Sequence, residues 1–92
     1  MKFIVEWEGP PAVQQAAVER FRKGGGLPPA NVKMLGRWHT IGQIHGFAIV
    51  EADSSDGLAA WMLEWGDLFT FKVTPALSDE ELGATLAAAQ AR

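Results

Sequence analysis

The sequence predicts one α+β domain whose strands and helices follow the order βαββαβ, with a further helix at the end of the chain. Segments of alternating apolar residues are typical of strands, and between them lie segments with the four-residue apolar spacing of helices. Glycine or proline stands near the ends of several of these segments. The order is that of the split βαβ, or ferredoxin-like, fold. Because 92 residues suit one domain, we expect a single unit over 1–92.

The first half of the chain is expected to form a strand, a helix and a loop. Apolar and polar residues alternate over 2–8, and Gly9-Pro10-Pro11 ends this strand. A helix over 11–23 follows, with apolar residues at four-residue spacing: Val13, Ala17 and Phe21. The triple glycine at 24–26 is expected to cap this helix and act as a flexible connector. It follows a helix, whereas a phosphate-binding glycine loop follows a strand.

The second half is expected to begin with two strands joined by a hairpin, over 32–40 and 46–52. A helix follows, with an apolar stripe at i, i+3, i+4 and i+7: Leu58, Trp61, Met62 and Trp65. The last strand covers about 68–74, and Pro75 should end it. Ser78 and Glu81 have capping-box spacing, which predicts a C-terminal helix over 78–91.

Regular alternation along the strands sorts the sheet into two faces. The face that we assign to the helices is almost wholly apolar: Phe3, Val5, Trp7, Val32, Met34, Gly36, Trp38, Ala48, Val50, Ala52, Phe69, Phe71 and Val73. The open face mixes apolar and ionisable residues: Ile4, Glu6, Glu8, Lys33, Leu35, Arg37, His39, Phe47, Ile49, Glu51, Thr70, Lys72 and Thr74. This assignment assumes that no β-bulge shifts the alternation within a strand.

Composition narrows the possible functions. Without cysteines and with only two histidines, the chain offers no disulfide and no obvious metal site, and we expect no cofactor. A net charge of −3 without a basic cluster disfavours nucleic acid. His45–Val50 partly matches an RNA-recognition signature, but Ile49 stands where a second stacking aromatic is needed, so RNA binding is a remote alternative. No signal peptide or membrane-length apolar run is present, so we expect a cytoplasmic protein.

The open face carries the predicted site and the predicted partner. Leu35, Phe47 and Ile49 would form an exposed apolar patch, which predicts pairing with a second copy of the chain. His39 beside a carboxylate is a weak candidate for a general base, or else a surface histidine. The remaining pocket or interface candidates form two expected ion pairs, Arg37 with Glu51 and Glu6 with Lys72.

Five segments together resemble the family catalogued as domain of unknown function 3303: FIVEW at 3–7, GRWH at 36–39, GFAIVEAD at 46–53, AAWMLEWGDL at 59–68 and FKVTP at 71–75. The resemblance covers nearly the whole chain up to Pro75. It implies a place among the dimeric α+β barrels, a group that includes cofactor-independent monooxygenases, muconolactone isomerases and stress-response domains. It transfers no catalytic residue to this chain.

Two functions from different classes follow. The first is a homodimeric α+β barrel that binds a small organic molecule in a cavity on the open sheet face, with cofactor-independent chemistry at His39 and a charge anchor at Arg37. The second is a non-enzymatic interaction or regulatory dimer in which the same residues only fix the interface. A cavity of a few hundred Å³ favours the first, and a solidly packed sheet interface favours the second.

Overall fold

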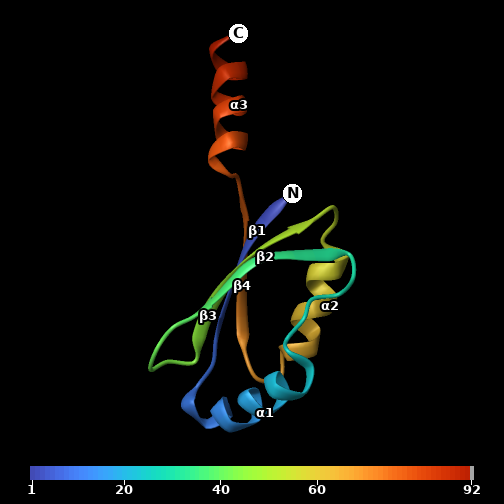
Figure 1. Ribbon diagram of the computed structural model, residues 1–92, viewed down its shortest axis with the longest axis vertical. Coiled ribbons are helices and arrows are strands. Elements are labelled where there is room, and N and C mark those ends of the chain that lie inside the picture. The colour runs from blue at the N-terminus through green and yellow to red at the C-terminus, as the bar shows by residue number, and fades with distance from the viewer. Residues whose placement is uncertain (92) are drawn as a thin grey trace.

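The computed structural model describes residues 1–91 and arranges four strands and three α-helices in the predicted order (Figure 1). The elements are β1 (Lys2–Glu8), the 3₁₀ turn η1 (Pro11–Val13), α1 (Gln14–Gly24), β2 (Val32–His39), β3 (His45–Ala52), α2 (Asp56–Trp65), β4 (Thr70–Ala76) and α3 (Asp79–Gln90). The strands form one antiparallel sheet in the order β2-β3-β1-β4. The prediction of a ferredoxin-like α+β fold with an additional C-terminal helix is confirmed.

The last strand differs from the prediction because Pro75 lies within β4 instead of ending it. β4 is an edge strand that pairs with β1 alone, and Pro75 stands opposite Phe3. Proline has no N–H to donate, which an edge strand tolerates because one of its sides has no neighbouring strand. The strand therefore continues to Ala76.

The core lies between the sheet and α2. Val5 of β1 and Ala48, Val50 and Ala52 of β3 are buried against Leu58 and Trp61 of α2. In β1, β3 and the first half of β2, the residues predicted to face the helices do so, because strict alternation holds there.

The second half of β2 faces the opposite way from the prediction. Met34 stands opposite Val50 and Gly36 stands opposite Ile49, so Leu35 is an extra residue in the ladder. This β-bulge reverses the alternation after it, since opposed residues on neighbouring strands share a face. Arg37 therefore lies opposite buried Ala48 on the helix-covered side. Trp38, predicted to be core, stacks on Phe47 at 5.4 Å between ring centroids on the open face.

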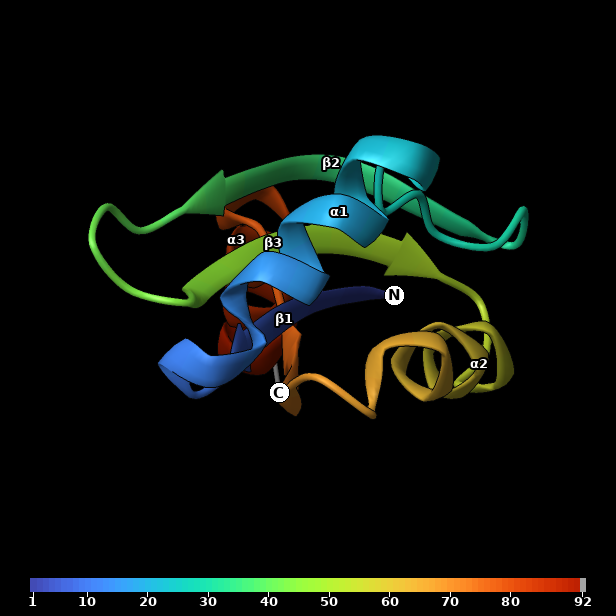
Figure 2. The same ribbon diagram turned by 90° about the horizontal axis from the view of Figure 1, so that it is seen from below.

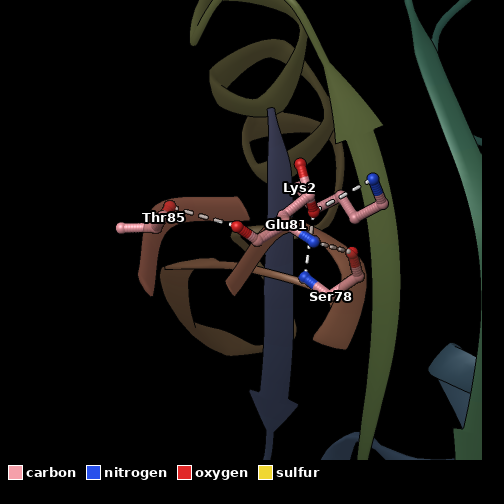
Figure 3. A network of polar contacts seen from close by, with 4 residues as sticks. All are labelled: Lys2, Ser78, Glu81 and Thr85. Atoms are coloured by element: carbon pink, nitrogen blue, oxygen red, sulfur yellow. Dashed lines mark hydrogen bonds and ion pairs between the residues drawn. The ribbon is translucent and has the colours of Figure 1, made fainter. Parts of the chain in front are cut away.

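The C-terminal helix α3 extends away from the sheet and the other helices (Figure 1). With α3 included, the molecule measures 53 × 28 × 17 Å. The predicted capping box is present: Glu81 N–H donates to Ser78 Oγ at 3.1 Å, and Ser78 N–H donates to Glu81 Oε1 at 2.9 Å (Figure 3). Lys2 Nζ of β1 lies 3.2 Å from the same carboxylate. None of the residues of α3 is buried, and Leu82 and Leu86 are exposed.

None of the helices in the described part of the chain is both long enough and apolar enough to cross a membrane.

Candidate functional site

A cavity of about 330 Å³ lies between the sheet and the two helices α1 and α2, whose arrangement Figure 2 shows from below. Its lining is mainly apolar and largely aromatic: Val5, Trp7, Ala17, Val18, Phe21, Ile44, Trp61, Met62, Trp65, Phe69 and Phe71. The other lining residues are Gln14, Gly26, Arg37, His39, Gln43 and His45. No acidic residue is among these 17.

Some of the apolar side chains that line the cavity remain exposed to solvent. Phe21 of α1 is 39% exposed and its neighbour Val18 is 42% exposed, although both line the cavity. The ring of His39 lies in T-shaped geometry against Trp7 and against Phe21, with centroid distances of 5.6 and 5.7 Å. Helix α1 therefore contributes apolar side chains to a space that remains unfilled, so this part of the helix layer differs from the closed core beneath α2.

Arg37 is the charged residue that the bulge brings to this cavity. Its Nη1 donates to the carbonyl oxygen of Gly26 at 2.7 Å, and its Nη2 donates to that of Gly25 at 2.9 Å. The guanidinium also lies over the ring of Phe21, 5.0 Å from its centroid. Partial burial lowers the pKa of Arg37, because desolvation disfavours the charged form. Among residues 1–91, no carboxylate forms an ion pair with Arg37.

The triple-glycine loop supplies the carbonyl oxygens that hold Arg37 in place. Gly25 and Gly26 have φ values of 71° and 59°, and Gly25 N–H donates to the carbonyl oxygen of Phe21 at 2.7 Å. The predicted helix cap is confirmed, since this is the left-handed geometry of a helix C-terminus. A Cβ atom at position 26 would stand 2.9 Å from Arg37 Nη1 and 3.2 Å from Phe21 Cδ2, so a side chain there would crowd the guanidinium.

A second arginine ties the two helices together beside the cavity. Arg20 of α1 binds both carboxylate oxygens of Asp67, at 2.8 and 2.7 Å, and donates to the carbonyl oxygen of Glu64 at 3.0 Å. Its guanidinium lies 5.3 Å from the centroid of Trp65, a cavity residue. The hydrogen bonds from Arg20 hold the pKa of Asp67 below its ordinary value. The sequence alone does not indicate this contact, because Arg20 and Asp67 are 47 residues apart.

The structure divides the predicted site residues between the two faces of the sheet. Arg37 and His39 line the cavity beneath the helices, whereas the alternation of β1, β3 and β4 leaves the others on the open face: Glu6, Phe47, Ile49, Glu51 and Lys72. The cavity that the single chain forms is thus on the opposite side from the face predicted to carry it. The bulge at Leu35 brings Arg37 and His39 of β2 to this side, because both residues follow it in the strand, whereas Lys33 precedes it.

The two predicted ion pairs have different outcomes. The expected pair of Arg37 with Glu51 is wrong: Glu51 stands opposite Lys2 and Lys33, and Arg37 is bound to glycine carbonyls instead. Glu6 does stand directly opposite Lys72, as predicted, although their charged atoms are not within ion-pair distance.

The expected carboxylate partner of His39 does not occur within residues 1–91, where its ring neighbours are Trp7 and Phe21. Sequence reasoning treated those two aromatic residues as core. Their strand and helix spacing correctly predicted that both side chains lie between the helices and the sheet, but spacing carries no sign of how far α1 stands from the sheet. In the same described part of the chain, no three His, Asp or Glu side chains are grouped so that they could hold a metal ion.

Comparison with known proteins places the chain by its sequence. No curated protein matches it. The family model described as "Domain of unknown function (DUF3303)" matches residues 1–90, nearly the full length of the chain. The chain belongs to the DUF3303 family.

Proposed function

We propose that this protein binds a small, largely apolar organic molecule in the cavity between α1, α2 and the sheet. The supporting observation is the cavity itself, about 330 Å³ in volume and walled mainly by apolar side chains, six of which are Trp or Phe. Sites for small ligands are typically concave, mostly apolar and about 300–1,000 Å³ in volume, with a few polar groups that orient the ligand. Here the ionisable groups are one arginine and two histidines.

Filling this space would be favourable because apolar wall surface is still in contact with water. Burial of apolar surface contributes roughly 25 cal/mol per Å². Phe21 and Val18 are partly exposed, so a bound molecule gains contact without first displacing a packed side chain. In any reaction without a cofactor, His39 and His45 are the wall residues of the type that most often acts as a general acid or base, and the ring of His39 lies against those of Trp7 and Phe21.

The dye N-phenyl-1-naphthylamine, which fluoresces strongly in apolar surroundings, tests this proposal. Val18→Trp adds bulk to the cavity wall, and Leu63→Trp adds the same side chain on α2 at a position that is 82% exposed and outside the cavity. We expect enhanced fluorescence with the wild type and with Leu63→Trp, and clearly weaker binding by Val18→Trp. Equal enhancement by all three proteins would locate the dye elsewhere and contradict the proposal.

The open sheet face supports a second proposal, that the protein is a homodimer of the α+β barrel kind. Trp38 is 53% exposed and stacks on Phe47, and Leu35 is also exposed on this strand. A large apolar patch on a sheet face usually marks an interaction site. An isolated helix of about 12–15 residues is only marginally stable in water, so α3, which buries none of its residues, would also gain from a partner.

Sedimentation velocity tests the dimer directly. We expect the wild type to sediment as a dimer at micromolar concentration, and the double variant Trp38→Ser/Phe47→Ser to sediment as a monomer. Leu63→Ser removes an exposed apolar side chain from α2 and is the matched control, which should remain dimeric. A monomeric wild type would contradict the second proposal without affecting the first, because the cavity is formed within one chain.

A further inference from the structure

We infer that the ligand of the cavity is an organic acid with a ring-containing apolar body, and that Arg37 receives its carboxylate. This inference rests on the proposed function and names the chemical class of the ligand. It depends on three observations: the charge of the cavity wall, the way in which Arg37 is held, and the aromatic character of the surrounding surface.

The charge of the cavity wall is opposite in sign to that of the chain. The protein carries 11 acidic against 8 basic residues, yet the cavity lining includes Arg37 and no Asp or Glu. The remaining polar side chains of the lining, two histidines and two glutamines, can all donate hydrogen bonds. A cation ligand would meet only repulsion from Arg37, whereas an anion would find a positive charge in a mostly apolar space.

Arg37 is held in place by neutral groups and lacks a counter-ion. A guanidinium has five N–H donors. Two of its hydrogen bonds go to the carbonyl oxygens of Gly25 and Gly26, and the other N–H groups make no hydrogen bond within residues 1–91. A partly buried charge without an opposite charge is unfavourable, and a carboxylate with bidentate geometry is the natural complement of a guanidinium. The two carbonyls fix its position before a ligand arrives, which lowers the ordering cost of binding.

The aromatic wall indicates the body of the ligand. Trp7, Phe21 and Trp65 are partly uncovered side chains from β1, α1 and α2, so flat surfaces approach the cavity from different elements. Aromatic rings interact favourably with other rings in stacked and edge-on geometry. A ring-bearing acid can therefore place its carboxylate at Arg37 and its ring against these walls.

The competing explanation is that Arg37 only fastens the glycine loop to β2. Two ligands of nearly identical shape, 2-naphthoate and 2-naphthamide, separate the explanations by isothermal titration calorimetry. A hydrogen-bonded charge pair should favour naphthoate over the neutral amide by about tenfold or more in the wild type. We expect Arg37→Gln to bring this ratio close to unity while naphthamide binding persists. Arg22→Gln, which removes an exposed cation of α1 outside the cavity lining, should leave the ratio unchanged.

The other possible outcomes distinguish failure of the anion inference from failure of the proposal that the cavity binds a ligand. Equal affinities in the wild type, or a naphthoate preference that survives in Arg37→Gln, would overturn the assignment of Arg37 as anion anchor. If Arg37→Gln does not fold, the wild-type ratio is decisive, and Arg37→Lys should retain part of the preference because it keeps the charge. Failure of both naphthalene ligands in a protein that binds the neutral dye refutes the anion inference alone, whereas failure of the dye as well refutes the binding proposal.

Discussion

The helix-covered face of the sheet is closed at one end and open at the other. Beneath α2, Ala48 and Val50 have no exposed surface, and Leu58 is 4% exposed. Beneath α1, the same face borders the cavity, and Phe21 remains 39% exposed although its spacing is that of a core residue. The contrast teaches that the two helices contribute differently: α2 packs Leu58 and Trp61 into the core and also lines part of the cavity, while α1 contributes mainly to the cavity wall.

The largest expected effect is on stability, when one side chain is truncated at the closed end of the face and one at the open end. Leu58→Ala should destabilise the protein by about 2–5 kcal/mol, because it leaves a cavity in a packed core. Phe21→Ala removes a larger side chain but should cost less, because Phe21 is only partly covered. Urea denaturation of both variants measures the difference. If Phe21→Ala costs as much as Leu58→Ala, the α1 end is packed as tightly as the core and the comparison fails.

A smaller effect is expected in the glycine loop that anchors Arg37. Gly26→Ala should cost about 1–2 kcal/mol, because alanine is strained at a positive φ and its Cβ would crowd the guanidinium. Gly24→Ala is the matched control: nothing lies within 4 Å of a Cβ there, and the residue is the last of α1. That variant should be neutral or slightly stabilising. Equal destabilisation by both variants would show that position 26 has no special geometry.

The smallest expected effect concerns the contact between Arg20 and Asp67. The pKa of Asp67 is held below its ordinary value of about 3.9, so these hydrogen bonds stabilise the folded state fully above that pH. Their contribution is lost as the pH falls through the lowered pKa. We expect Asp67→Asn to unfold at lower urea concentration than the wild type at pH 6, and the difference to shrink as the pH approaches 2. A difference that is constant over this range would contradict the role of the charge.

Much of the fold could be predicted because local patterns determine it. The alternation of Phe3, Val5 and Trp7, the helical stripe from Leu58 to Trp65 and the capping box at Ser78 each depend on neighbours a few residues away. These patterns specified the element order and the sheet-facing side of β1, β3 and α2. The continuation of β4 through Pro75 could not be predicted in the same way, because it depends on the edge position of that strand in the finished sheet.

The candidate site was predicted only in part because one extra residue in β2 reverses the face to which the side chains after it point. Arg37 and His39 were both predicted as site residues on one face of the sheet, but Leu35 shifts the alternation, and no local pattern distinguishes an extra residue from a regular one. The same shift brings Trp38 to the open face, where it enlarges the apolar patch predicted from Phe47 and Ile49. The distance between α1 and the sheet, which creates the cavity, is a tertiary property that side-chain spacing does not encode.

The four tryptophans test the central claim most directly, because they report on both faces of the sheet in one experiment. Trp7, Trp61 and Trp65 line the cavity, and Trp38 lies on the open face. In ¹H–¹⁵N spectra of the wild type titrated with 2-naphthoate, we expect the indole signals of the first three to shift in a saturable manner while that of Trp38 stays in place. Shifts confined to Trp38, with the three cavity signals unmoved, would contradict ligand binding beneath the helices.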